Sequence, residues 1–294
     1  MGPVNGGDRT SRHSAAAVAL ATALALSAPA CSSADGGLPE PEQDEGVRVL
    51  RGVESASPDG WSLLMDVYLP EGDGPFPAVE AIHGGGFVGG ARSDVRGVCI
   101  YLARSGYVAF AIDYRLAPEA TYPQQVEDAQ AAVGFVRDHA ADLTVDPDRI
   151  GVLGASAGAT IAATMAGVPG SGVGAVVSWS GAMDLPSLVT SGPAVADLRL
   201  ERYVGVEDLT SPEADARLRE ASPVTHVGPD YPPTFVANSK GELMPFDQAV
   251  AMVDALDGQG VPHVLFVPEG GHGMDYAREA SPPSVLFFDT YLTG

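Results

Sequence analysis

The sequence is poor in cysteine, since its 294 residues include only Cys31 and Cys99. Two thiols so far apart cannot build a disulfide framework or a cysteine zinc site. Cys99 falls in a predicted helix, where we interpret it as a small core residue rather than as a nucleophile. We therefore expect neither a structural zinc site nor a fold held together by disulfides.

Basic residues are also scarce. The chain has 16 Lys and Arg against 38 Asp and Glu, which gives a formal net charge of −22. Phosphate groups would be repelled by such a surface, so nucleic acid and anionic lipid surfaces are excluded as expected partners.

No apolar run is long enough to cross a bilayer as a stable helix. The run from Ala15 to Leu26 is uncharged and nearly all apolar; it follows Arg9 and Arg12 and precedes the small-residue triplet Ala28-Pro29-Ala30. A basic start, a short apolar centre and a small-residue end are the marks of a secretory signal peptide. We therefore expect residues 1–30 to direct export and to be absent from the mature protein.

Cys31 directly follows the predicted cleavage site and is followed by Ser32 and Ser33. This order resembles the lipidated cysteine of bacterial lipoproteins, although the triplet before it departs from the usual signal. Two outcomes stay open: a membrane tether through lipidated Cys31, or free secretion. Residues 31–46 have no apolar periodicity and are expected to form a flexible tether.

Residues 47–294 are long enough for one large core, and predicted strands alternate with predicted helices, which favours one α/β domain. A hairpin is expected first, because Ser57-Pro58-Asp59-Gly60 joins two strand-like segments. Helical crossovers then imply parallel strands. Glu80 is unusual for a strand, and we place it at the rim of the sheet. The expected strands are 47–53, 61–69, 78–82, 107–112, 150–153, 174–180, 234–237 and 261–267.

The stretch Gly154-Ala155-Ser156-Ala157-Gly158 lies between a short apolar strand and an alanine-rich helix. A G-x-S-x-G sequence in that context is a nucleophile elbow: its turn strains the serine, and the glycines let strand and helix approach closely. Ser156 is therefore the predicted nucleophile. The alternative is an ordinary glycine-rich turn.

His83-Gly84-Gly85-Gly86 follows the predicted strand 78–82. Consecutive glycines after a strand can turn several main-chain N–H groups toward one point, which is the arrangement that an oxyanion requires.

These two motifs, with Asp113-Tyr114-Arg115-Leu116-Ala117-Pro118-Glu119 between them, resemble the α/β-hydrolase carboxylesterases related to hormone-sensitive lipase. The resemblance extends from about Val47 to the C-terminus. It implies a mostly parallel eight-stranded sheet flanked by helices, and hydrolysis of short- to medium-chain esters without a cofactor. It also implies that Gly85, Gly86 and Ala157 donate to the oxyanion, and that His83 and Gly84 support that loop.

A serine hydroxyl needs an imidazole to take its proton. His272 lies in a glycine loop after the last predicted strand, where the order Ser, acid, His of this fold places the base. His226, at the end of an irregular segment, stays open as an alternative.

The acid is less clearly marked. It should follow the strand 234–237, but the family's aspartate position is occupied here by Gly241. Glu242, one residue on and one methylene longer, is the predicted acid, and Asp247 is the alternative. Asp113 and Arg115 are expected to hold loops through ion pairs rather than to act in the chemistry.

Residues 184–226 contain several prolines and lose the alternation of strands and helices. We expect an insertion that forms a lid or an acyl pocket. Its apolar residues either line that pocket or form the packed sides of small helices; they are Leu185, Leu188, Val189, Leu198, Leu200 and Tyr203.

The sequence thus predicts an exported serine carboxylesterase that acts on a small-molecule ester; it does not address oligomeric state. One alternative is a non-catalytic binding protein of the same fold in which Gly241 marks a decayed acid position. A polysaccharide deacetylase, a feruloyl-type esterase and a peptidase are alternatives within the hydrolases, and a peptidase would need an amine-recognition site that we cannot identify.

Overall fold

A computed structural model describes residues 1–2, 38–190 and 198–293. Apart from residues 1–2, the predicted signal peptide (residues 1–30) lies outside the described residues, as do the lipidation candidate Cys31 and the first part of the predicted tether.

The described strands form one nine-stranded sheet in the order β1-β2-β3-β5-β4-β6-β7-β8-β9. β3 pairs antiparallel with β2 and with β5, whereas all pairs from β5 through β4 to β9 are parallel. The sheet is therefore mostly parallel, as predicted, with an antiparallel edge. The strands are β1 (Glu42–Asp44), β2 (Val47–Ala56), β3 (Leu63–Leu69), β4 (Phe76–Ile82), β5 (Val108–Ile112), β6 (Val145–Ala155), β7 (Ala175–Trp179), β8 (Thr234–Ala237) and β9 (His263–Phe266).

β1 corrects the predicted boundary of the tether at residue 46. Glu42–Asp44 pair antiparallel with β2 and extend the sheet to nine strands. This polar strand has no apolar alternation that the sequence could reveal. Instead, the Asp44 carboxylate binds the guanidinium groups of Arg51 and Arg96, so charge rather than apolar burial holds the strand.

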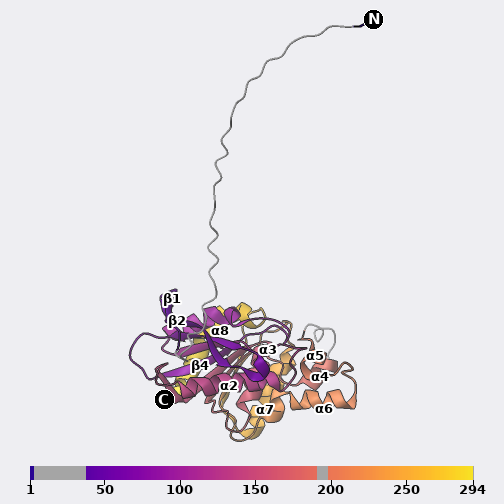
Figure 1. Cartoon of the computed structure of the whole chain (residues 1–294). Helices are drawn as coiled ribbons and strands as arrows, with labels where there is room; N and C mark the ends of the chain where they lie inside the picture. Colours follow the sequence, from indigo (N-terminus) through magenta and orange to yellow (C-terminus); the bar gives the residue numbers. More distant parts are fainter. Residues whose placement is uncertain (3–37, 191–197, 294) are drawn as a thin grey trace. The chain divides into compact units, whose positions relative to one another are not determined.

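Helices cover both faces of the sheet (Figure 1). One buried apolar cluster joins the sheet to α1 and α8, and a second joins the opposite face to α2, α3 and α7. The α-helices are α1 (Arg96–Arg104), α2 (Gln124–Asp138), α3 (Ala157–Ala166), α4 (Leu185–Thr190), α5 (Leu200–Val204), α6 (Pro212–Glu220), α7 (Phe246–Gln259) and α8 (Ala277–Leu292). The short 3-10 helices are η1 (Pro58–Gly60), η2 (Arg92–Val95), η4 (Pro223–His226) and η5 (Gly273–Tyr276).

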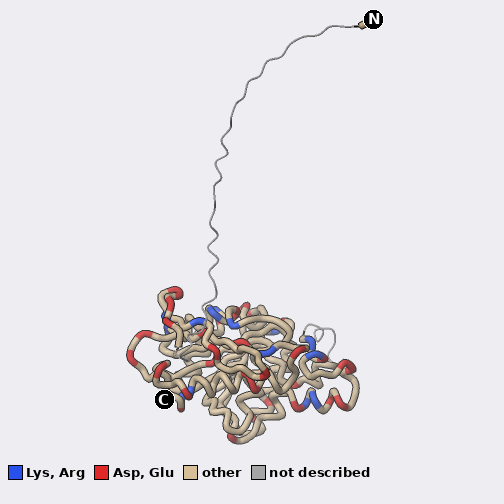
Figure 2. The backbone as a smooth tube through the Cα atoms, viewed as in Figure 1, with Lys and Arg blue, Asp and Glu red and all other residues tan. Residues whose placement is uncertain are grey.

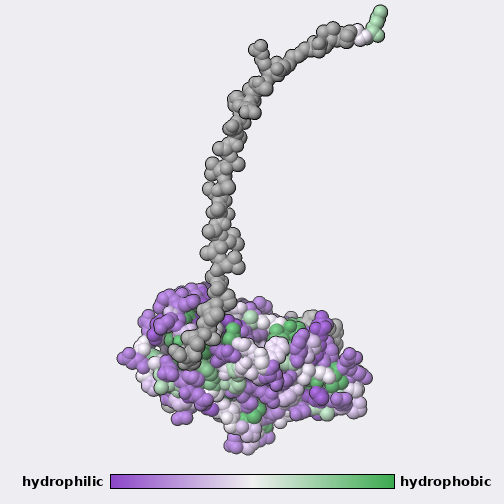
Figure 3. Space-filling model, in the orientation of Figure 1, coloured by the Kyte–Doolittle hydropathy of each residue, from purple (hydrophilic) through white to green (hydrophobic). Residues whose placement is uncertain are grey.

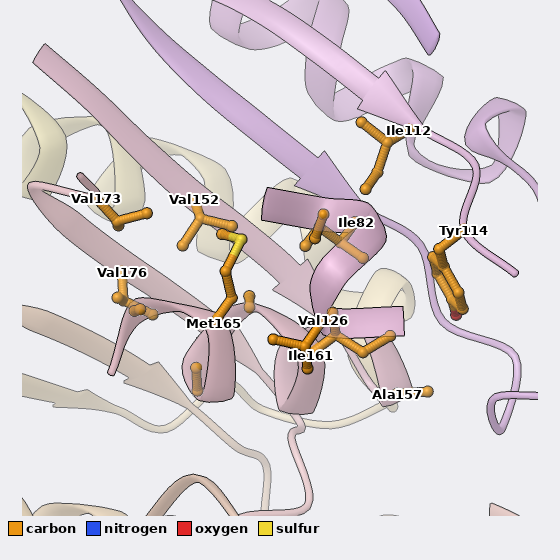
Figure 4. Packing of buried hydrophobic residues seen from close by; sticks show 14 of the residues in the cluster. Ile82, Ile112, Tyr114, Val126, Val152, Ala157, Ile161, Met165, Val173 and Val176 are labelled. Atoms are coloured by element: carbon orange, nitrogen blue, oxygen red, sulfur yellow. The ribbon is translucent and has the colours of Figure 1, made fainter. Parts of the chain in front are cut away.

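The second cluster shows why the central strands are mostly apolar toward their carboxyl ends. Ile82 of β4 and Val152 of β6 face Ile161 and Met165 of α3 (Figure 4). Their neighbours in sequence, Ala81 and Leu153, belong to the cluster with α1 and α8, so both sides of these strands are buried. This double burial anchors the carboxyl ends of the strands, from which the loops of the site extend.

The position of Glu80 differs from the sequence prediction. It lies in β4, between β5 and β6 at the centre of the sheet, and it is fully buried rather than at the rim. Within the described part of the chain, neither carboxylate oxygen has a hydrogen-bond partner. Burial raises the pKa of Glu80 well above its usual value, because a carboxylate is poorly solvated there.

The predicted insertion contains α4, α5, α6 and η4, and its three α-helices lie together at one end of the folded part (Figure 1). Most of its apolar side chains, for example Leu185 and Tyr203, are buried in the core cluster and form the packed sides of these small helices. Leu198 alone of the six pocket candidates lines the cavity at Ser156.

Acidic residues outnumber basic ones along the backbone (Figure 2), and the face in Figure 3 is mostly hydrophilic with scattered apolar residues. No helix within residues 38–190 and 198–293 is long and apolar enough to cross a membrane.

Candidate active site

Ser156 stands on the turn between β6 and α3 with a φ of 54°, in the left-handed region that side chains rarely adopt. The flanking glycines permit this turn. A Cβ at Gly154 would lie 2.2 Å from the carbonyl oxygen of Gly158, and a Cβ at Gly158 would lie 2.2 Å from that of Ile82. The strained elbow presents the serine hydroxyl at the carboxyl edge of the sheet.

The glycine loop after β4 lies against this elbow. A Cβ at Gly84 would lie 3.0 Å from the Cβ of Ser156, and a Cβ at Gly85 would overlap the carbonyl oxygen of Gly89 at 2.1 Å. Gly85 and Gly86 have φ values of 120° and 60°. Among the described residues, neither of their N–H groups donates to a protein acceptor. With the N–H of Ala157, which begins α3 and so lacks an intrahelical acceptor, they are free to bind an anion.

His83 holds the glycine loop in shape. Its Nδ1 donates a 2.7 Å hydrogen bond to the carbonyl oxygen of Gly84. The ring stacks on Tyr114 at a centroid separation of 4.4 Å, and the Tyr114 hydroxyl donates to the His83 carbonyl oxygen. Burial lowers the pKa of His83, which favours a neutral ring. His83 is thus a support of the loop.

His272 reaches Ser156 from the loop after β9. The distance between its Nε2 and the Ser156 Oγ is 2.9 Å, which is a hydrogen bond. The main-chain N–H of His272 donates to the carboxylate of Asp275, so the loop is closed on itself before η5 begins. The structure brings together the predicted nucleophile and base, which are 116 residues apart.

Glu242 lies on the other side of the imidazole. Its Oε2 contacts Nδ1 of His272, and its Oε1 accepts hydrogen bonds from the N–H of Ser239 and the hydroxyl of Ser180. Only 1% of the Glu242 side chain is exposed. Asp247, the alternative acid, is exposed at the start of α7.

The other candidates have different tasks. The Nε2 of His226 bonds to the carbonyl oxygen of Glu220. Asp113 accepts from Arg92, and Arg115 forms a buried ion pair with Asp128. These contacts agree with loop-holding roles for Asp113 and Arg115.

A cavity of about 340 Å³ opens over Ser156. The glycine loop and His272 form its polar side, and Leu198, Leu243 and Met274 form its apolar side. Asp94 is the one charged side chain among its described lining residues. No group of three or more His, Cys, Asp and Glu side chains within the described ranges could hold a metal ion.

Sequence reasoning did not identify Asp94, Leu243, Met274 or Ser180 as residues of the site. A signal for Leu243 and Met274 was present in the sequence, since each lies within two residues of a predicted triad member. Asp94 and Ser180 had no such signal, because their places depend on how η2 and the end of β7 fold.

Comparison with known proteins assigns the chain to a family. The sequence model of the BD-FAE family matches residues 65–256. The chain is 31% identical over 197 residues to the probable carboxylic ester hydrolase LipM of Mycobacterium tuberculosis, covering 62% of this chain and 45% of LipM. It is 32% identical over 201 residues to the esterase LipI of the same organism, covering 63% of this chain and 61% of LipI. The chain therefore covers less than two thirds of the length of either relative.

Among solved structures, the thermophilic carboxylesterase EstE1 from a metagenomic library superposes with a TM-score of 0.71 at 28% identity. The superposition covers 87% of this chain and 91% of EstE1. The family match spans the glycine loop, the elbow and Glu242, and the structural match spans nearly the whole domain. The chain therefore belongs to the BD-FAE family and has the α/β-hydrolase fold of carboxylesterases.

Proposed function

We propose that the protein is a serine carboxylesterase that hydrolyses esters of short- to medium-chain acids through an acyl-serine intermediate. The observation that carries the proposal is the 2.9 Å contact between the Ser156 Oγ and the His272 Nε2, with Glu242 bound to the other ring nitrogen. A decayed binding protein would have no reason to retain both contacts.

In the first half of the reaction, the Ser156 oxygen attacks the ester carbonyl carbon while His272 takes the hydroxyl proton. The carbonyl oxygen becomes an oxyanion, and the N–H groups of Gly85, Gly86 and Ala157 stabilise it. His272 then gives its proton to the departing alcohol oxygen. The products of this half are the free alcohol and an acyl-serine.

In the second half, water attacks the acyl carbon and His272 takes the water proton. Collapse of the second tetrahedral intermediate returns the proton to Ser156 and releases the carboxylic acid. Glu242 keeps the proton on Nδ1 and stabilises the charged ring in both halves.

The cavity size supports small acyl groups. A volume of about 340 Å³ is near the lower end of the range for small-molecule sites, about 300 to 1,000 Å³. The apolar wall of Leu198, Leu243 and Met274 suits a hydrocarbon chain. We expect activity to fall beyond medium chain length.

The test is hydrolysis of p-nitrophenyl esters from acetate to decanoate by the purified protein, with acetylated sugars and feruloyl esters alongside. Ser156→Ala is the control for background hydrolysis. Rates above that control, highest for the shorter chains, support the proposal. Equal rates for both proteins would refute it.

Export and membrane attachment belong to the same proposal. A basic start, an apolar run from Ala15 to Leu26 and the triplet before Cys31 support cleavage after Ala30. Mass spectrometry of the mature N-terminus tests this directly. An acylated Cys31 indicates a lipoprotein, an unmodified Cys31 indicates secretion, and a retained leader contradicts export.

A further inference from the structure

Ser180 directly follows β7 and is fully buried, and its φ is 54°. A serine in the left-handed region costs free energy that a glycine would not. Such strain is kept where the surrounding structure requires that side chain, which directs attention to its contacts.

Four hydrogen-bonded groups surround Ser180. Its N–H donates to the carbonyl oxygen of Ala237 at 2.8 Å, and its Oγ accepts from the N–H of Gly273 at 2.8 Å. The same Oγ lies 2.9 Å from the Oε1 of Glu242 and 2.6 Å from the hydroxyl oxygen of Tyr276. Ser180 thus joins the acid loop to the loop of His272.

Counting protons gives the direction of these bonds. Ser180 and Tyr276 have one hydroxyl proton each, and the ionised Glu242 can only accept. Ser180 therefore donates to Glu242. The Tyr276 hydroxyl has two acceptors within reach, the Ser180 Oγ at 2.6 Å and the Ala237 carbonyl oxygen at 3.0 Å. We assign its proton to Ser180, because that contact is shorter and the Ala237 carbonyl oxygen already accepts from the N–H of Ser180. The result is a directed chain from Tyr276 through Ser180 to the carboxylate.

We propose that Ser180 is a positioning residue for the reaction: it fixes the Oε1 of Glu242 so that Oε2 faces His272. The inference rests on the proposed function.

The position of the acid explains why such support is needed. The resemblance to the hormone-sensitive-lipase-related esterases led us to expect the acid at Gly241, and Glu242 comes one residue later. Gly241 itself has a φ of 80°. Its longer side chain has an additional rotatable bond, so the carboxylate needs more fixing than that of an aspartate. Ser180 and the N–H of Ser239 bind the same oxygen, Oε1, and leave Oε2 for the imidazole.

The end of β7 also holds the nucleophile. The carbonyl oxygen of Trp179 accepts a 2.8 Å hydrogen bond from the N–H of Ser156. Two consecutive residues, Trp179 and Ser180, therefore fix the serine and the acid relative to one another. A small shift at this strand end would misalign both groups.

Ser180→Gly is the main test, because it removes the hydroxyl while relieving the backbone strain. We expect kcat for p-nitrophenyl butyrate to fall about 10- to 100-fold, the effect of one hydrogen bond to a charged group, with KM little changed. Because glycine adopts a positive φ without strain, the backbone change should not lower the melting temperature. Ser180→Ala should show the same loss of kcat.

Ser178→Ala is the matched control. Ser178 lies two residues earlier on β7, is also buried, and its hydroxyl has no partner among the described residues. Its removal should leave kcat within about twofold, since no hydrogen bond is lost. A loss equal to that of Ser180→Gly would overturn the proposal.

A double-mutant cycle separates positioning from a merely structural role. If Ser180 acts through Glu242, then Ser180→Gly should change kcat less than about twofold in a Glu242→Gln background. An unchanged 10- to 100-fold loss in that background would contradict the proposal, as would a normal kcat in Ser180→Gly alone.

Failure of the proposed function has a different signature, namely equal rates for the wild type and Ser156→Ala. In that case the proton NMR signal of the His272 Nδ1–H decides the positioning role. A downfield signal that moves or broadens in Ser180→Gly supports it, and an unchanged signal refutes it.

Discussion

The Oε2 of Glu242 binds Nδ1 of His272, although the resemblance to the hormone-sensitive-lipase-related esterases led us to expect the acid one residue earlier, at Gly241. The longer side chain makes up for the displacement. Glu242 is buried, whereas Gly241 is an exposed residue with a left-handed backbone. A carboxylate therefore contacts the imidazole although the expected position, Gly241, carries none.

Glu242→Gln should lower kcat by about 10³- to 10⁴-fold, because an amide does not stabilise the charged imidazole or select its tautomer. Steady-state kinetics with p-nitrophenyl butyrate measure the loss.

Asp247→Asn is the control for this prediction, since Asp247 is exposed on α7. Its kcat should stay within about twofold of the wild type, the small effect usual for surface positions. A large loss in Asp247→Asn with a normal Glu242→Gln would reassign the acid.

Glu80 predicts a specific dependence of stability on pH. Its pKa in the folded state is raised above the ordinary value of 4.5 by burial. Above that pH the unfolded chain loses the proton while the folded chain keeps it, so folding becomes less favourable as pH rises. The slope is at most about 1.4 kcal/mol per pH unit.

Glu80→Gln removes this titration and keeps the shape. The melting temperature of the variant relative to the wild type should therefore rise between pH 5 and pH 8, by several degrees in total. Glu54→Gln, at an exposed position of β2, is the control and should show a constant difference. A constant difference for Glu80→Gln as well would show that Glu80 does not titrate as the structure requires.

A site residue could be predicted from the sequence where close contacts of its backbone determine which residue type is possible. The positions of Gly154, Gly158 and Gly84 are dictated by close backbone approach, so their pattern is visible in the sequence. The Ser156 and His272 pair follows from that pattern and the order of strands. These parts of the site were predictable because local chemistry determines them.

Other features depended on the fold. Ser180 and Ser178 are alike in sequence, and only the turn at the end of β7 aims one of them at Glu242. Glu80 was misplaced because its neighbours in sequence do not show that β4 is central. β1 was missed because its ion pairs join residues far apart in the chain, such as Asp44 and Arg96.

The ion pairs of β1 lead to the next prediction. Asp44 binds both Arg51 and Arg96, and the hydrogen bond from Arg96 is the main cause of its lowered pKa. Asp44→Asn should lower stability at neutral pH by about 1 to 2 kcal/mol, the scale of a partly buried charged hydrogen bond. Thermal unfolding measures the change.

The sign of the pH dependence follows from the lowered pKa of Asp44. Its contribution is present above the ordinary value of 3.8 and is lost as pH falls through the lower folded value. The gap between Asp44→Asn and the wild type should therefore close in acid. Asp73→Asn, at an exposed loop position, should leave stability within about 0.5 kcal/mol of the wild type throughout. A gap that persists at low pH would show that Asp44 acts through packing instead.

The position of Asp94 predicts that the cavity prefers substrates with a cationic alcohol group. Its carboxylate accepts a hydrogen bond from the N–H of Ala91 with Oδ2, and it faces a cavity that has no Lys or Arg among its described lining residues. A cationic alcohol group near Ser156 should gain about 1 kcal/mol from this carboxylate in a largely aqueous setting. Acetylcholine and its uncharged isostere 3,3-dimethylbutyl acetate form a matched pair of esters for measuring the gain.

The quantity to compare is the ratio of kcat/KM for acetylcholine to kcat/KM for 3,3-dimethylbutyl acetate. This ratio should be about fivefold higher in the wild type than in Asp94→Asn. The difference between the two proteins should shrink as salt is added. Asparagine keeps an acceptor for Ala91 and removes only the charge. Asp142→Asn changes the net charge equally at an exposed position away from the cavity lining, so it should leave the ratio as in the wild type. Equal ratios in all three proteins would mean that the Asp94 carboxylate is screened from the bound alcohol, and a fall in Asp142→Asn would assign the preference to the whole acidic surface.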